Sequence, residues 1–282
     1  VMINNISVAR PYHSGLQDAY LVYEIIVEGG ITRLMAVYKD KDTERIGSIR
    51  SSRHYFLDYA LENDAIYVHL GWSPTAKSDI TTLGVNNING LYDNVHWRDN
   101  SLNVDMEHTA FTSIKKISDI TSKKNYRTTT TTDPLLNYTV EEIDLSKETN
   151  GEVATNVSVR YSTTTTTSYK YNEDEKVYYR LVNNKAHVDY VTKEQYTAKN
   201  IIVAFVSNGA LRGDSSGRQD LNNIGTGEGY YITNGYAVPI TWEKSTRKSQ
   251  TIYKLKNGAE IQVSDGNTYI QIAPEKSLTI GE

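Results

Sequence analysis

The segment 47–77 restricts the fold more than any other part of this 282-residue chain, because it predicts two helix starts around one short strand. Ser52 is a suitable N-cap for a first helix, whose apolar residues recur at helical spacing at Phe56, Leu57, Ala60 and Leu61. The run 65–70 favours a strand. Ser73-Pro74 then predicts the second helix start, since serine caps helices and proline suits the first helical position.

Charged and aromatic residues accompany both helix starts. Arg50 and Arg53 lie beside the first, and His69 and Trp72 lie beside the second. Unpaired backbone N–H groups and the helix dipole make such positions suitable for anions, and two arginines can grip a carboxylate or phosphate in bidentate fashion. The structural alternative for the arginines is an ion pair with an acidic residue, for which the candidates are Glu24, Glu28 and Asp58.

His69 has two interpretations of equal weight. If the strands 31–38 and 65–70 are parallel neighbours, the loops after them open at one sheet edge, where α/β proteins bind ligands. Otherwise His69 is a buried histidine bonded to a backbone carbonyl. A second polar cluster, which could serve acid–base chemistry, bind a metal or face water, contains His96, Arg98, Asp99 and His108.

Composition limits the classes of function. A net charge of -4 without a basic stripe argues against nucleic-acid binding, and no window approaches the ~20 apolar residues of a membrane span. The absence of cysteine excludes disulfides, thiolate metal sites and cysteine nucleophiles. The chain starts at Val1 with no signal-peptide pattern, so we expect a targeting segment to have been removed.

Length and pattern predict two domains, 1–147 and 148–282, with an overall α+β fold. The first is expected to be a layered α/β-type domain, a sheet with helices and a ligand cleft. Its predicted elements are a helix at 19–27, a strand at 31–38 and a helix at 113–123. The second is expected to be β-rich and mainly antiparallel, with a hint of helix at 193–199 and strands at 153–161, 166–172, 176–182, 201–206, 228–233, 236–242, 249–255, 261–263 and 268–272. The threonine runs 128–132 and 163–167 predict exposed strand or loop.

Catalytic and cofactor motifs are incomplete. Gly71-Trp72-Ser73-Pro74-Thr75 lacks the closing glycine of a nucleophile elbow, and Ser73 is explained as a helix cap. The glycines of 225–229 do not have the dinucleotide-binding spacing and lead into a strand. No metal-binding loop is complete either. We therefore predict no cofactor, no metal and no assigned catalytic residue.

Long segments of the chain resemble a known family. The matching segments are HSGLQDAYLVYE (13–24), EGGITRLMAVY (28–38), GSIRSSRHYF (47–56), VHLGWSPTAK (68–77), HWRD (96–99), EHTAFTS (107–113), TAKNIIVAFV (197–206), GTGEGYYITNG (225–235) and GNTYIQIAP (266–274). They resemble the YerB-like lipoproteins of Gram-positive bacteria, a two-part domain of unknown function. The resemblance implies an upstream signal peptide with a lipid-bearing cysteine, which tethers the protein to the outer face of the cell membrane. Where members commonly have proline-histidine-asparagine, this chain has Glu107-His108-Thr109.

Three functional hypotheses follow. The first is a membrane-anchored envelope protein that binds an anionic cell-wall ligand or an envelope protein, with the candidate ligand-binding residues Glu24, Arg50, Arg53, His69, Trp72, Ser73, Arg98 and His108. The alternative is an envelope hydrolase or transferase with His69 or His108 as general base, which requires a histidine within hydrogen-bond reach of Asp99 or Glu24. A third hypothesis makes exposed tyrosines of the second domain a protein-binding surface.

Overall fold

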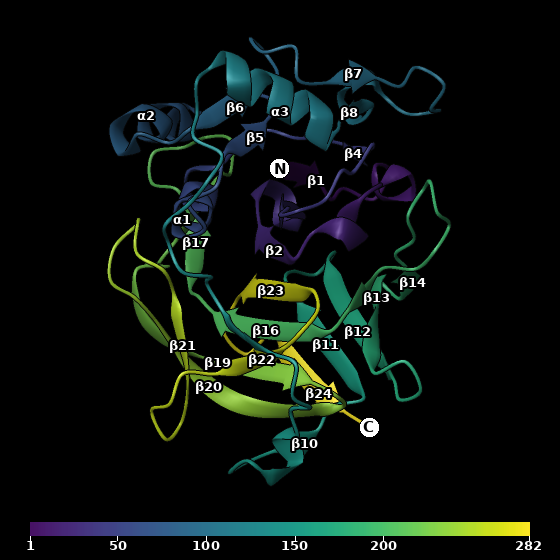
Figure 1. Ribbon diagram of the computed structural model, residues 1–282, viewed down its shortest axis with the longest axis vertical. Coiled ribbons are helices and arrows are strands. Elements are labelled where there is room, and N and C mark those ends of the chain that lie inside the picture. The colour runs from purple at the N-terminus through teal and green to yellow at the C-terminus, as the bar shows by residue number, and fades with distance from the viewer.

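The centre of the protein is a nine-stranded sheet built from both halves of the chain (Figure 1). The computed structural model describes all residues, Val1–Glu282. The strands follow the order β1 (Met2–Asn4), β3 (Thr32–Val37), β2 (Leu21–Ile26), β23 (Thr268–Ala273), β16 (Asn200–Phe205), β19 (Gly225–Thr233), β20 (Tyr236–Lys244) and β10 (Glu152–Val153), and β21 (Ile252–Leu255) also pairs with β20.

The strand β23 joins the two halves. It lies parallel to β2 on one side and parallel to β16 on the other, with Thr268 opposite both Leu21 and Asn200. A buried ion pair adds to this connection, because Nζ of Lys244 on β20 lies 2.8 Å from Oε2 of Glu62. The predicted boundary at 147–148 stays a prediction, but the sheet itself runs without interruption from one half to the other.

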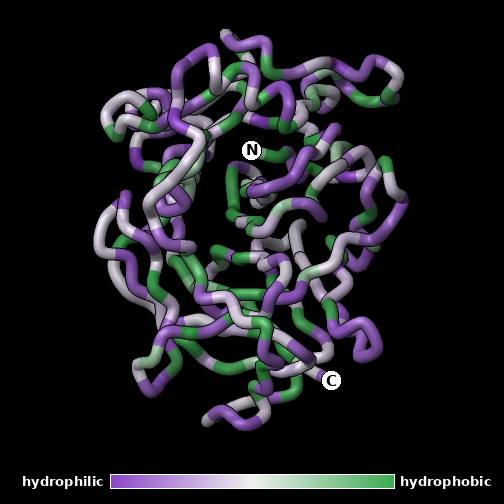
Figure 2. Tube along the Cα trace, in the orientation of Figure 1, coloured by the Kyte–Doolittle hydropathy of each residue, from purple (hydrophilic) through white to green (hydrophobic).

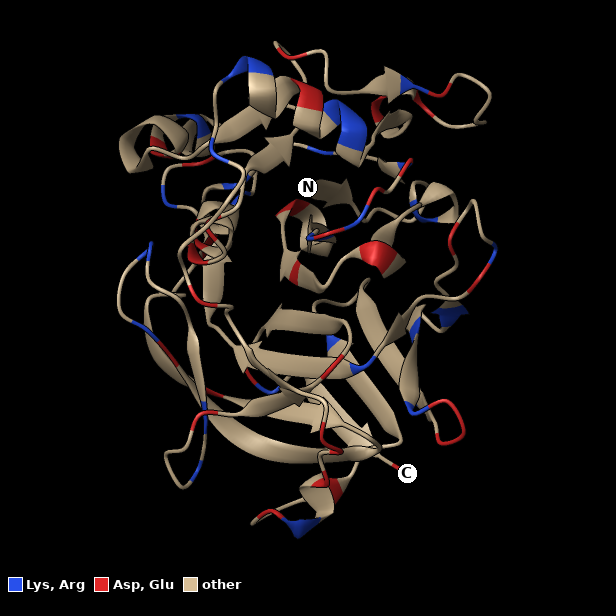
Figure 3. Ribbon diagram, viewed as in Figure 1, with Lys and Arg blue, Asp and Glu red and all other residues tan.

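A six-stranded antiparallel sheet covers one face of this central sheet. Its order is β14 (Lys185–Ala186), β13 (Val177–Val182), β12 (Thr166–Asn172), β11 (Asn156–Arg160) and β24 (Leu278–Gly281), and β15 (Thr197–Ala198) pairs with β13. Val157, Val159 and Tyr169 pack there against Val22 and Val203 of the central sheet. The apolar residues follow the central strands, whereas charged residues lie mainly on outer elements and loops (Figures 2 and 3).

Helices and small sheets form the N-terminal layer. The helices are α1 (His54–Glu62), α2 (Pro74–Leu83) and α3 (Ile114–Lys123). Its small sheets combine β4 (Ile46–Gly47), β8 (Ala110–Thr112) and β7 (Trp97–Arg98), and β5 (Tyr67–His69) and β6 (Asn87–Asn89). Two more two-stranded sheets use strands of the second half, and they pair β17 (Asn208–Ala210) with β18 (Gln219–Leu221) and β9 (Asn137–Thr139) with β22 (Gln262–Ser264). Short 3-10 helices occur at Arg10–Tyr12, Leu16–Asp18, Glu28–Gly30, Met106–His108 and Leu145–Lys147.

The α+β fold class and the β-rich, mainly antiparallel second half are confirmed. Each of the nine predicted strands in that half contains or overlaps an observed strand. The helix start at Ser73-Pro74 is also confirmed, since the Ser73 hydroxyl accepts a hydrogen bond from the Ala76 amide at 3.2 Å. Ser113 caps α3 in the same way through the amide of Lys116.

Three local predictions are wrong, and one arrangement that was considered as a condition does not occur. The predicted helix at 19–27 is the strand β2, which lacks the alternation that identifies a strand because hydrophobic clusters bury it on both faces. The predicted helix at 193–199 contains β15 instead. Arg53 rather than Ser52 is the N-cap of α1. The strands β3 and β5 are not neighbours, because β3 lies between β1 and β2 and β5 pairs with β6.

The second threonine run differs from its prediction as well. Thr165 and Thr167 are buried, whereas the run 128–132 is exposed as expected. Thr167 lies on β12, where its hydroxyl donates to Glu24 at 2.9 Å. A threonine can be buried there because a buried carboxylate accepts the hydrogen bond of its hydroxyl.

Candidate functional site

Both arginines that were predicted to bind an anion face a glutamate. Nη2 of Arg50 lies 2.6 Å from Oε2 of Glu107, and Nε of Arg53 donates to Oε1 of Glu28 at 2.6 Å. The hydrogen bond from Arg50 lowers the pKa of Glu107. Arg53 thus has the structural role that was the alternative for it. An anionic ligand would have to displace a carboxylate at each arginine.

The residues at the second helix start have structural partners too. His69 is fully buried; its Nδ1 lies 2.7 Å from the Gly71 carbonyl and its Nε2 lies 3.3 Å from Oδ1 of Asn87. Burial lowers the pKa of His69 and so favours the neutral ring. Trp72 packs between the rings of His69 and Tyr92, with centroid distances of 5.6 and 5.8 Å.

The polar cluster of β7 and the loop after it divides into separate contacts. Arg98 donates to the backbone carbonyl of Met106. Asp99 accepts from Nη1 of Arg45 at 2.8 Å and from the hydroxyl of Ser101 at 2.6 Å. Neither His69 nor His108 forms a hydrogen bond with Asp99 or Glu24, so the contact that the hydrolase hypothesis requires is not present.

Glu24, another predicted ligand residue, is the centre of a buried polar network. Its Oε2 lies 2.8 Å from Nη2 of Arg180, and neither side chain has any exposed surface. Its Oε1 accepts from the hydroxyl of Thr32 at 2.7 Å and from the side-chain amide of Asn5 at 3.2 Å. Burial alone would lower the pKa of Arg180, but the charge of Glu24 raises it above the usual value. The guanidinium is therefore charged.

The network continues from Arg180 through two buried histidines. Arg180 donates to Nδ1 of His187, Nε2 of His187 lies 2.9 Å from Nδ1 of His13, and Nε2 of His13 contacts the Asn4 carbonyl. The side-chain amide of Asn4 lies 2.8 Å from Nδ1 of His108. Because arginine only donates, both linking histidines carry their proton on Nε2. With this assignment, the Nε2–H group of His13 donates to the Asn4 carbonyl.

Burial keeps both linking histidines neutral. It lowers the pKa of His13 to about 3 and lowers the pKa of His187 well below its usual value. At the outer end of the network, Nε2 of His108 lies 3.6 Å from Glu107, which pairs with Arg50. The network therefore connects two predicted residues, Glu24 and His108. It fixes the contact between the halves rather than forming an open site.

Sequence reasoning missed His13, Arg180 and His187. A signal for Arg180 was present, because Tyr178, Arg180 and Val182 occupy alternate positions of β13 and all three are buried. An arginine at an inward position needs a buried acid. Glu24, which interrupts the apolar run of β2, is the matching acid.

The predicted site residues line none of the larger hollows of the protein. One of these, here called the junction cavity, lies where the two halves meet and has a volume of about 910 Å³. Several of its polar groups are already paired: Asp189 accepts from the Gly15 amide at 2.7 Å and the Tyr196 hydroxyl at 2.8 Å, and Gln17 donates to Thr197 at 3.0 Å. The carboxylates of Glu44 and Glu194 have no partner, but only three lining residues are hydrophobic, namely Tyr179, Val191 and Tyr196.

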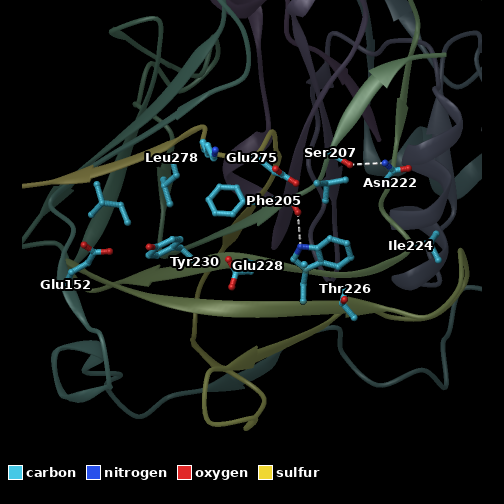
Figure 4. A pocket seen from close by; sticks show the side chains of 15 residues that line it. Glu152, Phe205, Ser207, Asn222, Ile224, Thr226, Glu228, Tyr230, Glu275 and Leu278 are labelled. Atoms are coloured by element: carbon cyan, nitrogen blue, oxygen red, sulfur yellow. Dashed lines mark hydrogen bonds between the residues drawn. The ribbon is translucent and has the colours of Figure 1, made fainter. Parts of the chain in front are cut away.

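A second hollow, the aromatic groove, offers more to a ligand (Figure 4). It has a volume of about 840 Å³ and lies among β16, β19, β20 and β24. Its apolar lining residues are Phe205, Val206, Ile224, Tyr230, Trp242, Leu278 and Ile280, and its charged ones are Glu152, Glu228, Glu275 and Lys276. Ser207, Asn222 and Thr226 add polar groups at one end of the groove.

Trp242 fixes the floor of the aromatic groove. Its indole Nε1 donates to the Phe205 carbonyl at 3.1 Å, and the Phe205 and Tyr230 rings meet edge to face at 6.3 Å. Gly227 makes room for the indole, because a Cβ there would lie 2.5 Å from Nε1 of Trp242. Gly229 allows β16 to approach, since a Cβ there would lie 2.1 Å from the Val203 carbonyl oxygen. The glycines of 225–229 thus shape the groove.

The expected surface of exposed tyrosines is not present in the second half. Tyr169, Tyr178, Tyr196, Tyr231 and Tyr269 are all buried. Their hydroxyls mostly act as hydrogen-bond donors inside the protein, such as that of Tyr231 to Asn200 at 2.9 Å. Tyrosine therefore serves the core of this protein, and Tyr230 is the one that lines the groove.

Two family models match the chain. Residues 1–127 match "Protein of unknown function (DUF3048) N-terminal domain", and residues 157–270 match the C-terminal domain of the same family. The chain belongs to this family. A protein of Bacillus subtilis named "Putative lipoprotein YerB" is 30% identical over 290 residues, which cover 100% of this chain and 83% of that protein.

The fold agrees with that of the relative. The crystal structure of YerB protein from Bacillus subtilis is similar at a TM-score of 0.86 and 29% identity, over 100% of this chain and 92% of that one. The resemblance to the YerB-like family is therefore confirmed. In this DUF3048 chain, β24 lies after the C-terminal match, so one wall of the aromatic groove lies outside both matched ranges.

Two further structural facts bear on function. None of the helices is both long and apolar enough to cross a bilayer. No group of three or more histidine and acidic side chains is arranged to hold a metal ion.

Proposed function

We propose that this protein is an extracytoplasmic, lipid-anchored component of the bacterial cell envelope that binds a partner in the aromatic groove. The lipid anchor and the outer location are supported by the name of the Bacillus subtilis relative and by the family resemblance. A binding role is supported over the hydrolase alternative because His69 and His108 are buried, and neither forms a hydrogen bond with Asp99 or Glu24, the acids that the alternative requires.

One observation carries the choice of site. The aromatic groove combines apolar side chains with polar groups that have no partner within the protein. Glu152 and Glu275 are exposed and form no ion pair, in contrast to Glu28 and Glu107, which neutralise the predicted arginines. A binding site typically joins an apolar lining to a few free polar groups. At Arg50 and Arg53, by contrast, the ion pairs with Glu107 and Glu28 weigh against binding of an anionic ligand to these arginines.

Location and binding can be tested in the native host with the protein expressed from its natural gene. We expect it to sediment with membranes and to be digested when protease is added to intact protoplasts. A photo-crosslinking amino acid at Ile224, which is 40% exposed in the groove, should give a discrete adduct with an envelope component. The same probe at Val140, which is 91% exposed and outside the groove, is the control.

Two results would contradict the proposal. Protection from protease in intact protoplasts would refute the outer location. Equal adducts at Ile224 and Val140, or none at Ile224, would refute the groove as the binding site.

A further inference from the structure

The strand β24 has one edge that pairs with nothing. It is the last strand of the six-stranded sheet and pairs only with β11, in the register Ser158 opposite Thr279 and Val157 opposite Ile280. A bare strand edge is a template on which another extended chain can add. Leu278 and Ile280 of this strand line the aromatic groove.

The backbone groups at this edge can be assigned. The Arg160 amide donates to the Ser277 carbonyl at 2.9 Å, so the pair 160/277 is hydrogen-bonded. Hydrogen-bonded and non-bonded pairs alternate along an antiparallel ladder, so Thr279 and Gly281 face β11 as well. The N–H and C=O groups of Leu278 and Ile280 therefore point away from β11, along the edge that borders the groove.

The negative charge of the groove favours a partner segment with basic side chains. Glu152, Glu228 and Glu275 against Lys276 leave a formal charge of -2. Lys256 pairs with Glu228 at 2.9 Å and so reduces this charge to -1, whereas Glu152 and Glu275 form no ion pair. A segment with basic side chains would meet these acids at the rim. Its apolar side chains would reach Phe205 and Tyr230, because alternate residues of a strand face opposite ways.

We propose that the aromatic groove binds an extended, basic segment of a partner protein by strand addition to β24. This inference rests on the proposed function and specifies its partner. The added strand would pair with the N–H and C=O groups of Leu278 and Ile280, place alternate apolar residues over Phe205 and Tyr230, and face Glu152 and Glu275 with its cations.

The test is a titration of the purified chain with a fluorescent, end-capped octapeptide of alternating valine and lysine. We expect saturable binding that falls roughly tenfold when glutamate replaces lysine in the peptide, because rim charges then repel. N-methylation of the amides that face β24 keeps the charge and should also abolish most binding. In hydrogen exchange, the peptide should slow the exchange of the backbone amides of Leu278 and Ile280, whereas the exchange rate of the Thr279 amide should not change.

Protein variants provide the matched control. Glu152→Gln with Glu275→Gln should weaken the binding of the valine–lysine peptide roughly tenfold. Glu141→Gln with Glu173→Gln removes the same charge from exposed residues outside the groove and should leave binding unchanged.

Several outcomes would overturn the inference. Binding that survives N-methylation would mean a charge contact without strand addition, and a β24-mediated dimer in sedimentation would mean that a second copy occupies the edge. If the octapeptide fails to bind while Ile224 still crosslinks an envelope component in cells, strand addition is wrong and the proposed function stands. If Ile224 gives no adduct, the proposed function fails first.

Discussion

The buried pair of Glu24 and Arg180 should make Arg180→Met one of the most destabilising single substitutions in this protein. Methionine is a flexible, unbranched side chain without charge, so the variant leaves a carboxylate with no exposed surface and without its cation. Removing one partner of a buried ion pair typically costs about 3–5 kcal/mol. For a chain of this size, that loss lowers Tm by roughly 6–10 °C, at about 2 °C per kcal/mol.

A double-mutant cycle with Glu24→Gln tests this reasoning, because Glu24→Gln removes the charge that Arg180→Met leaves unpaired. The double variant should be less destabilised than the two single losses together, with a coupling of at least about 2 kcal/mol. Urea unfolding at pH 7, followed by tryptophan fluorescence, measures all three variants. A loss of unfolding free energy below about 1 kcal/mol for Arg180→Met, or strictly additive losses, would refute the reasoning. Such small or additive losses are typical of ion pairs that are exposed to water.

Three further predictions concern other parts of the fold. Burial lowers the pKa of His13 to about 3 and lowers that of His187 well below its usual value, so below about pH 6.5 the unfolded chain binds protons that the folded chain does not. The free energy of unfolding should therefore fall as the pH drops from 7 to 5, by up to about 1.36 kcal/mol per pH unit for each histidine, and His187→Gln should flatten this slope in urea titrations. A slope that the substitution leaves unchanged would contradict this. Gly227→Ala should destabilise by roughly 1–3 kcal/mol and perturb Trp242 fluorescence, whereas Gly209→Ala, with no atom within 4 Å of its Cβ, should do neither; equal effects would disprove the role of Gly227. Ser73→Ala should cost about 1 kcal/mol through the lost cap of α2, measured by thermal unfolding, and a neutral result would show that Pro74 alone is sufficient.

The parts of the fold that the sequence predicted are those set by local chemistry. Ser73-Pro74 and Ser113 determine helix starts through their own side chains. Several strands of the second half, such as β11, β12 and β13, alternate between buried and less buried residues. The strand β2 was missed because both of its faces are buried, Leu21, Tyr23 and Ile25 in one hydrophobic cluster and Val22 and Ile26 in the other. Its sheet partner β23 lies almost the whole chain away in sequence.

The candidate site was harder to predict because its partners are distant in sequence. Arg50 pairs with Glu107, and Glu24 pairs with Arg180. No local pattern joins such residues. The aromatic groove combines β16 and β19 with β24, a strand that was not predicted at all. Its one local signal was the spacing of Gly225, Gly227 and Gly229, which does not fit a dinucleotide site but does fit a strand that must accept an indole on its surface.

The most direct test of the central claim compares two variants by their crosslinking yield at Ile224 in living cells. Arg50→Ala removes a partly exposed ion pair from the ligand-binding residues that the sequence predicted. Glu152→Gln with Glu275→Gln changes the charge of the aromatic groove instead. If the groove binds the partner, the yield stays at the wild-type level in Arg50→Ala and falls roughly tenfold in the glutamate variant. A lower yield in Arg50→Ala, with no change in the glutamate variant, would contradict the claim.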